Sequence, residues 1–124
     1  MTVENYISDL LYRYDCVIVP NFGGFITNPI GAKVNNFTHT FYPPTKQLSF
    51  NSHLTHNDGL LANYIAASEQ ISFEEATLKI ASVVAKWQAT LAINSVNITN
   101  IGVLSLNEHK QIIFEPLNRV NYLT

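Results

Sequence analysis

The chain has 124 residues, of which 47% are hydrophobic and 13% are charged. A soluble domain usually carries about 25% charged residues, so this chain is poor in charge, and its hydrophobic content excludes an intrinsically disordered protein. Seven Lys and Arg against nine Asp and Glu give a net charge of −2, the wrong sign for a protein that binds by neutralising phosphates. A single cysteine excludes an internal disulfide, and no apolar run is long enough to cross a bilayer.

The first half of the sequence predicts one helix followed by strands. Apolar residues recur at spacings of three and four over residues 3–14, which indicates an amphipathic helix. Residues 16–28 are typical of two short strands bent around glycine. A turn signal at 28–31 is followed by a polar, β-prone stretch at 32–41 and by one more short strand at 47–51.

The second half predicts two helices followed by strands. A short helix is expected over residues 59–69. Ser72 and Glu75 then have the spacing of a capping box, in which the two side chains satisfy free amide groups at a helix start. The helix that they open keeps its apolar spacing over residues 73–92, and the alternating pattern from 96 to 114 predicts two or three short strands.

An internal repeat relates the two halves. Residues 17–28 align without a gap on residues 96–107, and in both copies a helix, a strand, an asparagine, an apolar residue, a glycine and a strand follow in this order. The asparagine is expected to take a positive φ, and the glycine to let one backbone pass close to another. The residues assigned to this structural hairpin motif are Pro20, Asn21, Phe22, Gly23, Asn100 and Gly102.

The repeat extends beyond the hairpin in the sequence. Residues 41–43 match 114–116 through a shared Phe-x-Pro pattern, and residues 48–50 match 120–122. The second half therefore reads as a copy of the first with a shorter excursion between its strands. The phenylalanines expected in the core of the first copy are Phe22, Phe25, Phe41 and Phe50.

The hairpin is similar to a known motif. The segment that resembles the L-P-G-F-G-T-F hairpin of the bacterial histone-like HU/IHF superfamily runs Val19-Pro20-Asn21-Phe22-Gly23-Gly24-Phe25. The second half resembles that fold throughout, and the first half resembles a copy trimmed of its leading helix. The resemblance implies an α+β fold of two HU/IHF-like repeats, residues 1–56 and 57–124, packed as an intramolecular pseudo-dimer.

A narrower resemblance concerns the order of motifs along the chain. The motifs at residues 6–11, 15–20, 41–44, 48–51 and 57–61 resemble the tandem HU-like region that opens certain bacterial SPOR-domain cell-envelope proteins. In such proteins a cytoplasmic module precedes a transmembrane helix and a peptidoglycan-binding SPOR domain. The resemblance thus implies a module on the cytoplasmic side, tethered to the inner membrane through a downstream segment.

The pattern of basic residues departs from the HU family. HU proteins bind DNA with two long basic arms, each ending in an R-N-P tip whose proline wedges between base pairs. Asn28-Pro29 is faintly similar to that tip, but Thr27 stands in the arginine position, and the second excursion, 107–111, is too short for an arm. The candidate DNA contacts are Pro29, Lys33, Lys46, Lys110 and Arg119.

We therefore expect a non-enzymatic interaction module that binds protein partners, without a cofactor. DNA binding that tethers the chromosome to the cell envelope is the alternative, and a homodimer through leftover apolar surface is also left open. Cys16 is expected to be a buried, inert thiol, and the two histidines at 53 and 56 lack a third metal ligand, so no catalytic or metal site is assigned. The candidate protein-binding patch consists of Tyr42, Trp87 and Tyr122.

Overall fold

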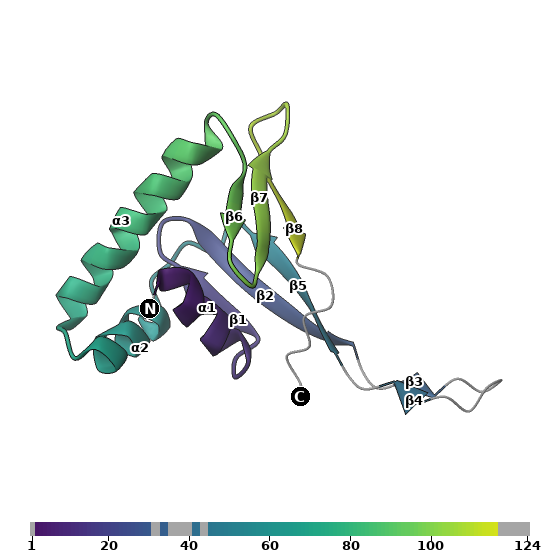
Figure 1. Ribbon diagram of the computed structural model, residues 1–124, viewed down its shortest axis with the longest axis horizontal. Helices are drawn as coiled ribbons and strands as arrows, with labels where there is room; N and C mark the ends of the chain where they lie inside the picture. The colour runs from purple at the N-terminus through teal and green to yellow at the C-terminus, as the bar shows by residue number, and fades with distance from the viewer. Residues whose placement is uncertain (1, 31–32, 35–40, 43–44, 117–124) are drawn as a thin grey trace.

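The structure is a computed structural model that describes residues 2–30, 33–34, 41–42 and 45–116 (Figure 1). The helices are α1 (Val3–Leu11), α2 (Leu60–Glu69) and α3 (Phe73–Leu91). The strands are β1 (Cys16–Val19), β2 (Gly23–Ile30), β3 (Lys33–Val34), β4 (Phe41–Tyr42), β5 (Thr45–Asn51), β6 (Val96–Ile98), β7 (Gly102–Leu106) and β8 (Ile112–Pro116). Two antiparallel sheets have the orders β1-β2-β5 and β6-β7-β8, which confirms the α+β class.

Helix α1 is shorter than its periodicity predicts. The Thr2 hydroxyl accepts an amide of the first turn, at 3.4 Å, and so caps the helix. The helix ends at Leu11 rather than near Tyr14, because the amides of Arg13 and Tyr14 both return to the carbonyl of Leu10 in a closing turn. The first half therefore contributes one short helix ahead of its strands.

The capping box of α3 is present with altered geometry. The Ser72 hydroxyl oxygen accepts the backbone N–H of Glu75 at 3.0 Å, as predicted. The Glu75 carboxylate, however, accepts the Ser72 hydroxyl at 3.3 Å instead of the backbone amide. The cap still anchors the start of the longest helix, which runs for 19 residues.

The two copies of the hairpin have the same register. Val17 lies opposite Phe25 in the first sheet, and Val96 lies opposite Leu104 in the second. These are the pairs that a gapless alignment of the two segments places in equivalent positions. The predicted hairpin repeat is confirmed.

The third strands correct one part of the repeat. Phe50 lies opposite Phe25, and Phe114 lies opposite Leu104, so Phe50 is the structural equivalent of Phe114. Phe41 instead pairs with Val34 in the small sheet of β3 and β4. The predicted match of 41–43 with 114–116 is therefore wrong, because the Phe-x-Pro pattern of the first copy begins at Phe41, which lies within the longer excursion. The match of 48–50 with 120–122 is wrong with it, because Phe50 is equivalent to Phe114.

That longer excursion is a two-stranded arm. Strands β2 and β5 stay paired from Gly24 opposite Asn51 to Ile30 opposite Thr45, well past the end of β1. The pair β3 and β4 lies farther out, away from both three-stranded sheets (Figure 1). We call the described residues of this stretch, 27–30, 33–34, 41–42 and 45–48, the arm. The turn predicted at 28–31 is wrong, because residues 28–30 continue β2 to Ile30.

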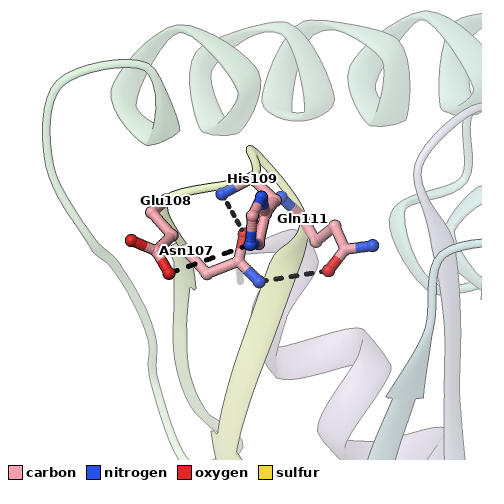
Figure 2. A network of polar contacts seen from close by, with 4 residues as sticks. All are labelled: Asn107, Glu108, His109 and Gln111. Atoms are coloured by element: carbon pink, nitrogen blue, oxygen red, sulfur yellow. Dashed lines mark hydrogen bonds and ion pairs between the residues drawn. The ribbon is translucent and has the colours of Figure 1, made fainter.

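In the second copy, a tight turn connects the equivalent strands β7 and β8. The side-chain oxygen of Asn107 accepts the amides of His109 and Gln111, both at 2.9 Å, and its nitrogen donates to the Gln111 side chain at 3.1 Å (Figure 2). Lys110 completes the turn with a φ of 61°. The prediction that this excursion is too short for an arm is confirmed.

Both halves share one hydrophobic core. The Phe25 ring is 5.0 Å from Phe50 of its own repeat and 5.7 Å from Phe114 of the other. Phe22 of the first repeat likewise lies 5.2 Å from Trp87 of α3. The repeats therefore pack against each other within one chain, as the pseudo-dimer interpretation requires.

Candidate interaction surface

The hairpin motif has a structural role in both copies. Asn21 has a φ of 64° and Asn100 a φ of 65°, in the left-handed region that asparagine tolerates better than other residues with a β-carbon. In each turn the next residue donates its amide to the carbonyl three residues back, at 3.0 Å. Pro20 precedes Asn21 in the first turn, and its ring fixes its own φ there.

The motif glycines are required by close approach. A β-carbon on Gly23 would lie 2.3 Å from the Phe50 ring, and one on Gly102 would lie 2.3 Å from the carbonyl oxygen of Glu115. Both distances are too short for non-bonded atoms. The expectation that these glycines let another segment pass close is confirmed, and Phe22 of the same motif is buried.

The structure brings only part of the candidate DNA contacts together. Pro29 lies within β2 opposite Lys46 of β5, and Lys33 lies in β3, so these three share the arm. Pro29 is therefore not at a hairpin tip, and its similarity to a wedging tip proline does not hold. A proline is tolerated here because β1 pairs with β2 only as far as Ile26, so that no described strand pairs with the outer edge of β2 at Pro29. Lys110 lies in the separate β7–β8 turn.

The candidate protein-binding patch is not supported at its central residue. Trp87 is only 5% exposed and packs against Phe22, so it belongs to the core. Its helical spacing with the other buried residues of α3 already indicated this. Tyr42 is placed in β4, but its side chain lies outside the described part of the structure. Tyr122 and the candidate DNA contact Arg119 also lie outside the described residues.

A groove of about 390 Å³ lies where the helices of the two repeats meet. The first turns of α1 form one wall, the end of α2 forms a second, and one face of α3 forms the third. We call it the seam groove. The apolar side chains that line it are Val3, Ile65, Val83 and Trp87.

A polar network crosses the seam groove from one repeat to the other. The Tyr6 hydroxyl of α1 donates to the Glu69 carboxylate of α2 at 2.8 Å, and the Lys79 ammonium of α3 donates to the same carboxylate. The hydrogen bonds from Lys79 and then Tyr6 lower the pKa of Glu69. The bond to Glu69, followed by burial, raises the pKa of Tyr6.

A second lysine of α3 lines the same groove without such a partner. Among the residues that the structure describes, no carboxylate pairs with the Lys86 ammonium. Sequence reasoning missed this site because its walls come from both halves of the chain. One signal was available, since Lys79, Val83 and Lys86 are spaced by four and three residues and so share a helix face.

The described residues offer little for chemistry at a reactive site. Cys16 is half-buried, and burial, followed by the nearby Asp58 charge, raises the pKa of its thiol, which disfavours the reactive thiolate. In the ranges that the structure covers, no three side chains of His, Cys, Asp or Glu gather closely enough to hold a metal ion. No helix in those ranges has the length and apolarity needed to span a bilayer.

The arrangement defines a class of protein. Two strand–turn–strand units, the first preceded by one helix and the second by two, together with one arm, make this a tandem HU-like chain. More narrowly, the chain belongs to the CCDC81-like prokaryotic HU family: residues 1–58 match its HU domain 1 and residues 59–124 match its HU domain 2. The division predicted after residue 56 falls in the same connector between β5 and α2. No curated protein and no solved structure gives a significant match.

Proposed function

We propose that this chain is a non-enzymatic interaction module whose partners are proteins. HU-like domains are architectural binding modules, so the question for this chain is which kind of partner they bind. The observation that carries the proposal is the placement of the cations. The only lysines of the arm are Lys33 and Lys46. Lys79 forms an ion pair with Glu69, and Lys110 lies in the β7–β8 hairpin.

Such a distribution is poorly suited to phosphate binding. Non-specific DNA binding draws nearly all of its affinity from the release of counterions by clustered Lys and Arg. Here the cations of the described residues are divided among the arm, the segment after α1, helix α3 and the β7–β8 turn, and the net charge of the chain is −2. A protein partner needs no such cluster, and the seam groove offers an apolar surface with a polar edge, the composition typical of ligand pockets.

DNA binding is the second candidate, and the arm favours it. A two-stranded ribbon that projects from the body is the element with which HU proteins reach around DNA. In this chain the arm holds Pro29 opposite Lys46 and carries Lys33 farther out. The arm geometry thus supports a DNA contact that its charge does not.

A titration of labelled duplex DNA with the chain separates the two candidates. Fluorescence anisotropy is measured at low and at moderate salt, with Lys33→Glu plus Lys46→Glu as the test variant and Arg13→Glu plus Lys86→Glu, at two exposed cations outside the arm, as the matched control. We expect no binding in the micromolar range at either salt concentration. Binding that weakens steeply with salt and is lost in the arm variant, but not in the control, would make the chain a DNA-binding module.

We further propose a setting for the module. Its resemblance to the opening region of SPOR-domain proteins supports a cytoplasmic head tethered to the inner membrane, with partners in the cell envelope. The sequence of the gene and the fractionation of native cells test this. A gene without a downstream transmembrane segment, together with a soluble protein, would contradict the setting while leaving the interaction function open.

A further inference from the structure

We propose that the seam groove binds a peptide segment of the partner in which an apolar side chain lies beside a carboxylate. The inference rests on the proposed function, because it names the surface through which a protein partner is recognised. Three features support it: the volume of the groove, the apolar side chains that line it, and Lys86, a lining cation that has no carboxylate partner among the described residues.

The groove has the dimensions of a ligand site. Its volume of about 390 Å³ falls within the range of roughly 300–1,000 Å³ that is usual for such sites, which occur preferentially where two domains meet. The seam groove occupies that position, since α1 belongs to the first repeat and α2 and α3 to the second. Val83 is half-buried on its α3 wall and offers an apolar contact for one aliphatic or aromatic side chain, and the largely buried Trp87 lines the same wall.

The charged side chains of the groove determine which charge is favoured in the partner, beside its apolar side chain. Four charged side chains line it: Glu4, Glu69, Lys79 and Lys86. Glu69 is satisfied by Lys79 and by the Tyr6 hydroxyl. Glu4 lies in the first turn of α1, where the free amides of the helix start compensate a negative charge.

Lys86 is the remaining charge. No carboxylate of the described residues pairs with its ammonium group, and Lys86 lines the groove from the same helix as Trp87. A partner carboxylate beside the apolar anchor would complete this pair. A basic group in the same place would instead meet a like charge, so the groove discriminates between acidic and basic peptides of equal size.

A pair of blocked dipeptides tests the proposal on the whole chain. Acetyl-leucyl-glutamate amide and acetyl-leucyl-lysine amide have similar size and opposite charge. Each is titrated into ¹⁵N-labelled protein while the amide signals and the indole N–H signal of Trp87, the only tryptophan, are followed by NMR. Millimolar affinity is expected for ligands this small. The acidic dipeptide should shift the signals of Ser82, Val83, Lys86 and the Trp87 indole, and the basic one should bind several-fold more weakly.

Two pairs of variants locate the site. Lys86→Glu should reverse the charge preference, whereas Lys110→Glu, in the β7–β8 turn, should leave it unchanged. Ser82→Tyr should fill the groove and abolish the shifts, whereas Ala85→Tyr places the same side chain at an exposed position of α3 that does not line the groove. All four positions are exposed, so the fold should tolerate the changes.

The outcomes separate this inference from the proposed function. Shifts that avoid the groove, equal affinity for both dipeptides, or no binding of either would overturn the groove proposal. Salt-sensitive DNA binding through the arm would overturn the proposed function instead, whichever dipeptide result accompanies it. Acidic preference that is lost in Lys86→Glu and Ser82→Tyr, and kept in both controls, is the result we expect.

Discussion

The two repeats differ in how they connect their second and third sheet strands, β2 to β5 in the first repeat and β7 to β8 in the second. Between β2 and β5 the first repeat places the paired strands β3 and β4 and so extends the arm, whereas between β7 and β8 the second repeat has only residues 107–111, held by the side chain of Asn107 (Figure 2). The helices differ in the other direction: α1 has 9 residues where α3 has 19. One repeat has thus extended its strands and the other has extended its helices.

The difference shows which residues the shared fold requires. Both copies retain an asparagine at positive φ and a glycine with no room for a β-carbon. Both also place a phenylalanine of the third strand, Phe50 or Phe114, against Phe25. The excursions carry no such requirement, so they are free to diverge, and with them the basic arm that DNA binding needs.

The largest expected effect concerns the residue that joins the two repeats. Phe25→Ala should lower the free energy of unfolding by about 3–5 kcal/mol, and Leu104→Ala, at the equivalent position, by about 2–5 kcal/mol. Both side chains are fully buried. The Phe25 ring also contacts the third-strand phenylalanine of each repeat, since its centroid lies 5.0 Å from that of Phe50 and 5.7 Å from that of Phe114. Urea denaturation followed by circular dichroism measures both. Two separate transitions would contradict a shared core.

The motif glycines should differ although the gap at each is equally short. Gly102→Ala should cost about 3 kcal/mol, because its β-carbon would meet a backbone oxygen that cannot move without shifting β8. Gly23→Ala should cost about 1–2 kcal/mol, because the nearest atoms belong to the Phe50 ring, which can rotate away. The same denaturation assay compares them. Equal losses would show that the two hairpins are packed alike at this point.

Replacing a turn asparagine by a residue that tolerates a positive φ less well should lower the stability of the chain. Asn21→Ala should destabilise the chain by about 1 kcal/mol relative to Asn21→Gly, because alanine is strained at a φ of 64° and glycine is not. Asn100, at 65°, predicts the same difference between its alanine and glycine variants. Thermal denaturation of the four variants measures it. An alanine variant as stable as its glycine counterpart would remove the backbone explanation of the repeat.

The smallest effect is the pH dependence of the network between the repeats. Because the pKa of Glu69 is lowered in the folded state, its contribution is present above the ordinary glutamate range and is lost as the pH falls through the folded pKa. Because the pKa of Tyr6 is raised, its contribution is present below the ordinary tyrosine pKa and is lost as the pH rises through the folded one.

Glu69→Gln therefore should lower Tm most near neutral pH and less towards either end of the range. Circular dichroism melts between pH 3 and about pH 11, where tyrosine ionises, measure the difference from the unmodified chain. The exposed Glu115→Gln serves as the control, with no such dependence expected. A Tm difference that stays constant with pH would contradict the role given to the network.

Local patterns in the sequence predicted the local structure. The asparagine–glycine spacing predicted both hairpins, and the Ser72 cap predicted the start of α3. The arm was missed because Asn28-Pro29 is a turn signal by composition, and only pairing with the distant β5 makes it strand. The seam groove was missed for the same reason, since Tyr6 and Glu69 meet only once the two halves have packed.

The central claim is that the chain meets proteins through the seam groove and does not meet DNA through the arm. The most direct test places a photo-crosslinking amino acid at Ser82 in the groove or at Lys33 in the arm and irradiates native cells. The account predicts a discrete protein adduct from position 82 that Lys86→Glu removes, and no DNA adduct from position 33. DNA adducts from position 33, without a protein adduct from position 82, would contradict it.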